Sequence, residues 1–197
     1  MARDETAMME RGQFFTFYQD DGTTVDSTGG AHLEGCERVF EDVDYSVYGV
    51  KSYRSNKPVT CRLVRNASGG TLGRALFAQY KTNGTTGDVL GGQVSGVGDT
   101  VGQIGGVVDE FITESVPANA LFWLVVEGPS MMIALNGTDI AAGLNVIPST
   151  GGKFIAQDTT VAAGAATFNQ IQGAIGRLTL ASTEADNERI VLVRRMA

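Results

Sequence analysis

The chain has 197 residues and a mass of 20.8 kDa, the size of one domain or of one domain with an appended arm. A hydrophobic content of 43% supports a real core, and a formal charge of −7 argues against nucleic acid or an anionic membrane as the main partner. The sequence contains 26 glycines and only 4 prolines, which favours many tight turns over long helices.

The N-terminal part of the chain is polar and then abruptly aromatic. Residues 1–13 are mostly polar or charged, and four aromatic residues follow within five positions, namely Phe14, Phe15, Phe17 and Tyr18. Two alternatives are open for these rings. They form a strand that packs on the chain's own domain, or they belong to an extended arm that docks on another subunit, because aromatic residues are enriched in interface cores. Under the second alternative the four rings are partner contacts, and the arm becomes ordered only on binding.

A turn-rich loop over residues 20–35 leads into an acidic segment. Its carboxylates are Glu34, Glu37, Glu41, Asp42 and Asp44. They do not alternate around a glycine turn as calcium ligands do, so we expect a solvent-exposed face. Residues 45–53 predict a strand, which Ser55-Asn56-Lys57-Pro58 should end. We therefore expect an arm and acidic segment over residues 1–57 and a β domain over residues 58–197.

The remaining sequence predicts short strands separated by Gly-rich turns. Strands are expected over residues 59–65 and 74–80, and hairpin turns at Asn83-Gly84 and Asn136-Gly137. Residues 84–106 favour small-residue strands and turns, and residues 159–172 an irregular loop. Four further strands are predicted over residues 144–148, 153–156, 175–181 and 190–193. The pattern contains no long amphipathic helix, so we expect an all-β fold, a small sandwich or barrel.

One uninterrupted apolar run is expected to be the central strand of this domain. The predicted core residues are Leu121, Phe122, Trp123, Leu124, Val125 and Val126. Six apolar residues in succession leave no polar face, so both faces of the strand should be covered. Gly128-Pro129 should end the strand.

The sequence shows no pattern typical of catalysis or of metal binding. His32 is the only histidine, and Cys36 and Cys61 are the only cysteines, which we expect to be reduced thiols. Nucleophile-elbow and zinc-protease motifs are absent, although a pair of catalytic carboxylates distant in sequence stays open. We therefore expect no enzyme activity, no cofactor, no metal and no catalytic residue. No apolar run reaches the roughly 20 residues that span a bilayer, and the N-terminus lacks a signal sequence, so synthesis in a cytoplasm is expected.

Several short motifs resemble the small β proteins of tailed-phage virions, in particular capsid decoration (cement) proteins. The resemblance covers roughly residues 58–195, whereas residues 1–57 match nothing we can place. The motifs are Arg65-Asn66-Ala67-Ser68-Gly69-Gly70-Thr71-Leu72, Gly105-Gly106-Val107-Val108-Asp109-Glu110, Val116-Pro117-Ala118-Asn119, the run from Leu121 to Pro129, and Ala141-Ala142-Gly143-Leu144.

The resemblance implies a structural protein of the virion. Such proteins bind the outer surface of the expanded shell, clamp neighbouring major capsid subunits and often form trimers. We therefore expect the major capsid protein as partner, a homo-oligomer with a trimer favoured, and neither nucleic acid nor membrane. The chain would be made in the host cytoplasm and end on the outer capsid surface. The alternative is a β-rich fibre, tail or receptor-binding module that recognises a glycan or a host surface protein.

Overall fold

The computed structural model describes residues 10–44, 52–86, 89–96, 104–135, 145–156, 176–178 and 188–193. It confirms the all-β fold, because the described chain consists of strands joined by turns and two short 3-10 helices. The strands are β1 Phe14–Phe15, β2 Glu37–Asp44, β3 Ser52–Asn66, β4 Phe77–Thr82, β5 Val89–Gly96, β6 Ile104–Val108, β7 Leu121–Ile133, β8 Asn145–Pro148, β9 Phe154–Ala156, β10 Gly176–Leu178 and β11 Glu188–Val193. The 3-10 helices are η2 Ala31–Leu33 and η3 Thr150–Gly152.

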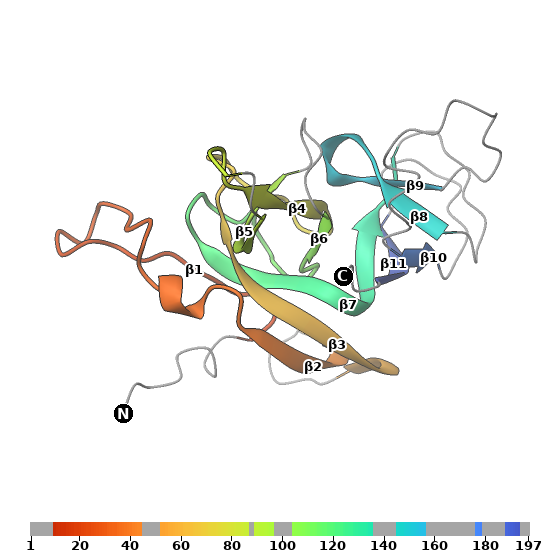
Figure 1. Cartoon of the computed structure of the whole chain (residues 1–197). Coiled ribbons are helices and arrows are strands. Elements are labelled where there is room, and N and C mark those ends of the chain that lie inside the picture. Colours follow the sequence, from red (N-terminus) through yellow and green to blue (C-terminus); the bar gives the residue numbers. More distant parts are fainter. Residues whose placement is uncertain are drawn as a thin grey trace.

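The strand pairings close into a small ring that makes the fold barrel-like. β3 pairs in parallel with β5, and antiparallel pairings then lead from β5 to β4, from β4 to β6 and from β6 to β7. β7 pairs with β3 and completes the ring. β2 extends the sheet beyond β3, while β11, β10, β8 and β9 continue it from β7 (Figure 1). β7 therefore connects the ring to the C-terminal strands.

Two buried apolar clusters lie on the two faces of β7. The ring cluster receives side chains from all five ring strands, among them Val64, Ala78, Val94, Val108 and Leu124. The outer cluster joins β2 and β3 to the C-terminal strands, and its members include Phe40, Leu63, Trp123, Met132 and Phe154. The Phe40 and Trp123 rings meet edge to face with centroids 5.3 Å apart, a favoured aromatic geometry.

The six apolar residues of the central strand divide evenly between these clusters. Phe122, Leu124 and Val126 belong to the ring cluster, and Leu121, Trp123 and Val125 belong to the outer cluster. All six side chains are buried. The alternation follows from the pleat of a strand, in which successive side chains point to opposite faces.

The prediction that Gly128-Pro129 ends this strand is wrong, because β7 continues to Ile133. The dipeptide instead marks a change of partner. Up to Glu127 the strand pairs with β3, and from Gly128 onward it pairs with β11. Gly128 has a φ of 109°, and a Cβ atom there would lie 2.5 Å from the carbonyl oxygen of Pro58. Only glycine fits this bend, where the backbone of β3 approaches closely.

The predicted strand end at Ser55-Asn56-Lys57-Pro58 is also wrong, since β3 runs through it. Pro58 lies opposite Glu41 of β2, next to the irregularity between Glu41 and Val43. On the other edge of β3, pairing with β7 begins only at Thr60. A proline is tolerated there because it sits next to a bulge and before the second ladder starts. One strand thus spans the boundary proposed between residues 57 and 58.

The acidic segment is a sheet strand rather than only a solvated face. Glu37 and Glu41 of β2 are exposed as expected, but Asp42 is buried. Glu37 accepts hydrogen bonds from Arg62 across the β2–β3 ladder, the closest at 2.6 Å. Phe40 and Val43 are buried as well and attach the strand to the core. The apolar residues between the charges therefore determine the structure of this segment.

The remaining predicted strands correspond to observed ones, with shifted ends. β4 and β5 form the hairpin predicted around Asn83-Gly84, but residues 83–88 connect them rather than a two-residue turn. β8, β9, β10 and β11 lie within or across the four C-terminal segments predicted as strands. The second hairpin turn, the loop over residues 159–172 and most of the strand predicted over 45–53 lie outside the described residues. Among the residues described, no helix is long and apolar enough to cross a membrane.

Candidate functional site

The N-terminal aromatic residues pack partly on the chain's own domain. Phe14 and Phe15 form β1, which pairs antiparallel with β7 so that Phe14 lies opposite Phe122 and Phe15 opposite Leu121. Phe14 is half-buried against the ring cluster. Phe15 points the other way and is 42% exposed. The first of the two alternatives, a strand packed on the same domain, therefore describes Phe14.

Phe17 is also held by the domain, in contact with the Gly29-Gly30 turn. It packs half-buried against the outer cluster. A Cβ atom at Gly29 would lie 2.5 Å from the Cβ of Phe17, and one at Gly30 would lie 2.6 Å from its ring. The two glycines are needed because the Phe17 side chain lies directly on the backbone of this turn.

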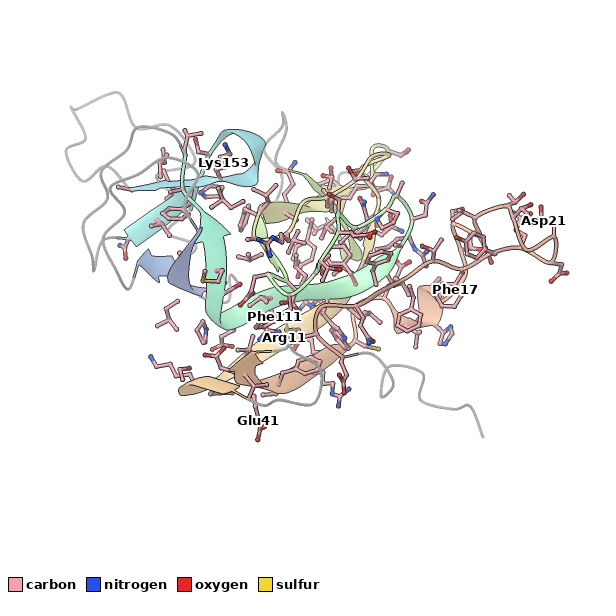
Figure 2. The ribbon with its side chains drawn as sticks, turned by 180° about the vertical axis from the view of Figure 1, so that it is seen from behind. Arg11, Phe17, Asp21, Glu41, Phe111 and Lys153 are labelled. Carbon is pink, nitrogen blue, oxygen red and sulfur yellow. The ribbon has the colours of Figure 1, made fainter. Side chains whose placement is uncertain are left out.

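Beyond Phe17 the chain forms a projecting β-hairpin over residues 17–26, which we call the N-terminal hairpin. Tyr18 and Val25 form an antiparallel bridge, and the amide of Gln19 donates to the carbonyl of Thr24 at 2.8 Å. The amide of Asp26 donates to the carbonyl of Phe17, also at 2.8 Å, and closes the base of the hairpin. In Figure 2 the hairpin extends away from the body of the molecule.

Carboxylates of two aspartates order the hairpin. Asp21, at its tip in Figure 2, accepts hydrogen bonds from the amides of Thr23 and Thr24 at 2.9 and 2.8 Å and from the Thr24 hydroxyl. The hydroxyl bond and the two amide bonds lower the pKa of Asp21 from 3.8 to about 2, because they favour the ionised carboxylate. Asp26 accepts from the hydroxyl and the amide of Thr28, which lower its pKa in the same way.

The exposed apolar side chains of the described residues concentrate on this part of the surface. Four large hydrophobic residues are exposed among the described residues, and three of them, Phe15, Tyr18 and Val25, lie on β1 or the N-terminal hairpin. Tyr18 is 55% exposed and Val25 is 36% exposed. The hairpin also carries Asp20, Asp21 and Asp26, and the sequence has no lysine or arginine between residues 11 and 38. This surface is therefore both apolar and anionic.

A buried ion network fixes the start of this segment to the barrel. The Arg11 guanidinium donates to both oxygens of Asp109 at 2.9 and 3.2 Å and to Glu110 at 3.2 Å. Glu110 also accepts from the hydroxyl of Ser130 at 2.9 Å. The guanidinium lies 4.8 Å from the centre of the Phe111 ring, next to which it is seen in Figure 2. Arg11, Asp109, Glu110 and Ser130 are all buried, so the network is structural rather than accessible to a substrate.

The electrostatics of this network favour the ionised guanidinium. Burial alone would lower the pKa of Arg11, but the charges of Asp109 and Glu110 outweigh it and raise the pKa above its ordinary value. The amide of Gly12 donates to Asp109 as well, at 3.0 Å. The chain is therefore tied to the turn that follows β6 before it reaches β1.

Arg65 provides a second anchor, next to the C-terminal end of the 3-10 helix η2. Its buried guanidinium donates to Glu34, to the carbonyl of Gly29 and to the carbonyl of Asn119. These bonds join the loop that follows the hairpin to the turn that precedes β7. The base of the N-terminal hairpin is consequently fixed on two sides, by Arg65 and by the packing of Phe17.

The residues considered for chemistry do not come together. His32 is exposed on η2, Cys36 is an exposed free thiol and Cys61 is a buried free thiol. Burial raises the pKa of the Cys61 thiol well above its ordinary value and keeps it protonated. Within the described ranges, no group of three or more His, Cys, Asp or Glu residues could hold a metal ion.

The sequence contained a signal for the hairpin but none for its anchor. Asp21-Gly22 lies between Tyr18 and Val25, and Asp-Gly flanked by such residues is a known hairpin signal. The loop predicted over residues 20–35 therefore begins as the turn of a hairpin. Arg11, in contrast, is one charged residue in a polar stretch, and its partners lie about a hundred positions away, at separations of 98 and 99 residues. No local pattern could reveal that pairing.

A search against protein families found no match, and a search of curated proteins found none either. Among solved structures, the chain is similar to the crystal structure of the N base of head fiber gp8.5 of bacteriophage phi29. That similarity has a TM-score of 0.42 and a sequence identity of 10%, and it covers 69% of this chain and 94% of that chain.

Proposed function

We propose that the chain is a structural protein of a phage virion that binds the outer surface of the assembled capsid and clamps neighbouring major capsid subunits. The motifs over residues 58–195 that resemble capsid decoration proteins support this proposal. The structural observation that carries it is the exposure of Phe15 on β1 and of Tyr18 and Val25 on the adjoining N-terminal hairpin. Exposed apolar groups that gather in this way are typical of sites that bind another protein.

Such binding would stabilise the capsid through thermodynamic linkage between binding and shell stability. A protein that binds the expanded shell but not its separated subunits stabilises the shell in proportion to the logarithm of the ligand concentration over Kd. The chain needs no reactive group for this task, and we propose that it is not an enzyme. A stable β domain with a rigid projecting contact surface is sufficient. A trimer, the state favoured by the resemblance, would add binding strength through multivalency.

The test is a comparison of two capsid states. Capsids of the encoding phage, prepared without this chain, are incubated with the purified protein in their expanded and in their compact form, and bound protein is measured by sedimentation. We expect binding to expanded capsids and a rise in their thermal disruption temperature. Equal binding to both forms, or binding to neither, would refute the proposal. Light scattering on the free chain measures its oligomeric state in the same preparation.

A fibre, tail or receptor-binding module is the alternative function. It predicts that the chain binds host cells or their glycans and leaves capsid stability unchanged. The same purified protein can therefore be added to intact host cells and to a glycan array. Saturable binding there, together with no effect on capsids, would favour the alternative.

A further inference from the structure

We propose that the N-terminal hairpin docks by inserting Tyr18 and Val25 into an apolar groove of a partner protein whose rim carries lysine or arginine side chains. The inference deepens the proposed function and rests on it for the identity of the partner, the major capsid protein. It specifies which part of this chain makes the contact and which chemical groups the partner surface must carry.

The apolar half of this contact is already in place in the free chain. Tyr18 and Val25 are 55% and 36% exposed although they are paired across the hairpin. The hydrogen bonds from Gln19 to Thr24 and from Asp26 to Phe17 fix their backbone on both sides of the bridge. A preordered contact surface loses little conformational entropy on binding, so most of the free energy of burying these side chains remains available for affinity.

The charges on the hairpin indicate what surrounds the groove. Asp20 and Asp21 are exposed at the tip, and the hairpin contains no lysine or arginine, whereas Asp26 at the base is near enough to Arg65 to feel its charge. Complementary charges accelerate encounter and select the correct partner, whereas like charges oppose it. A second copy of this chain, with its net charge of −7, is therefore a poor occupant, and a cationic protein surface is the matching one.

Hydrogen bonds within the chain fix two of these carboxylates in position. Both oxygens of Asp21 already accept bonds within the hairpin, one of them from two amides and the other from the Thr24 hydroxyl. One oxygen of Asp26 accepts two bonds from Thr28. These bonds hold the two carboxylates in place, so that they act as fixed negative charges. A fixed negative charge attracts lysine and arginine side chains.

The experiment uses two variants of the full chain, each with a matched control. Tyr18→Ser removes the exposed ring, and its control is Val39→Ser, at an apolar residue that is 61% exposed on β2. Asp20→Lys reverses a charge on the hairpin, and its control is Glu114→Lys, at an exposed carboxylate outside the hairpin. Equal thermal midpoints of all four variants and the wild type verify that folding is intact. Binding to expanded capsids is measured at several salt concentrations.

We expect Tyr18→Ser to weaken binding at least about tenfold, as for a central aromatic contact. Asp20→Lys should slow association and weaken the salt dependence, because exposed charges act over a Debye length of about 8 Å at physiological salt. Both controls should bind as the wild type does. Wild-type binding that neither hairpin variant alters would overturn this inference and leave the proposed function standing. A wild type that fails to bind capsids would overturn both. Binding to host glycans that Tyr18→Ser abolishes would assign the hairpin to sugar recognition instead.

Discussion

Replacing Arg11 with methionine tests whether the N-terminal segment is part of the folded domain. Methionine keeps an apolar chain of similar length but removes the guanidinium. The change breaks the bonds at 2.9 and 3.2 Å to Asp109 and the bond at 3.2 Å to Glu110, and it leaves two carboxylates buried without their cation. Removing one partner of a buried ion pair typically costs about 3–5 kcal/mol, because the remaining charge stays desolvated.

Other contacts of Arg11 change this value only slightly. The stacking of the guanidinium 4.8 Å from the Phe111 ring adds roughly 0.5–1 kcal/mol to the loss. The methionine side chain can retain part of the apolar packing of the arginine stem. We therefore expect a loss of about 3–5 kcal/mol in the free energy of unfolding for Arg11→Met.

The assay is urea denaturation monitored by the fluorescence of Trp123, the single tryptophan, which is buried against Phe40. A double-mutant cycle with Asp109→Asn isolates the pairwise contribution, and the double variant should lose less than the sum of the single losses. Arg11→Lys should lie between wild type and Arg11→Met, since lysine cannot make the two-pronged contact. A loss below about 1 kcal/mol for Arg11→Met would show that the segment is not anchored, and a free arm would then be the better description.

Three further expectations concern the core, the histidine and the hairpin tip. Trp123→Ala should cost about 3–5 kcal/mol in the same denaturation assay, against less than about 0.5 kcal/mol for Val39→Ala, and a small loss at Trp123 would contradict its burial. His32→Gln should leave capsid binding unchanged within error, whereas a loss of about tenfold would assign the imidazole a role. Asp21 has its pKa lowered from 3.8 to about 2, so its stabilisation of the hairpin should be complete above its unfolded pKa and disappear as the pH falls through about 2. An NMR titration of the Thr24 amide measures this midpoint, and Asp21→Asn should abolish the transition.

The central strand shows what one sequence can reveal. The run from Leu121 to Val126 predicted a strand covered on both faces, and the two apolar clusters lie on those faces. Such a run is informative because its uninterrupted apolar composition is enough to predict that both faces of the strand are buried. The strand end predicted at Gly128-Pro129 is wrong, because a local breaker signal cannot distinguish the end of a strand from a place where the strand exchanges one partner for another.

The candidate site was less predictable, and the reason is distance along the chain. The aromatic character of Phe14 to Tyr18 was visible, but which rings are buried depends on β7 and on the Gly29-Gly30 turn. Nothing in the sequence distinguishes Asp42 from its acidic neighbours, yet Asp42 is buried. Its burial depends on how β2 lies against the rest of the sheet. Contacts of this kind are set by tertiary structure, which overrides local propensity.

The pairing of β1 with β7 also constrains the order in which the chain can fold during synthesis. Phe14 lies opposite Phe122, and Arg11 needs partners 98 and 99 positions further on. These residues leave the ribosome before β6 and β7 do, so Phe14 and Phe17 cannot pack against the core until those strands have emerged. Topologies with such high contact order fold slowly, because a long loop has to close before its contacts are gained. These aromatic residues are therefore uncovered while about a hundred further residues are synthesised, and chaperones can bind them during that interval.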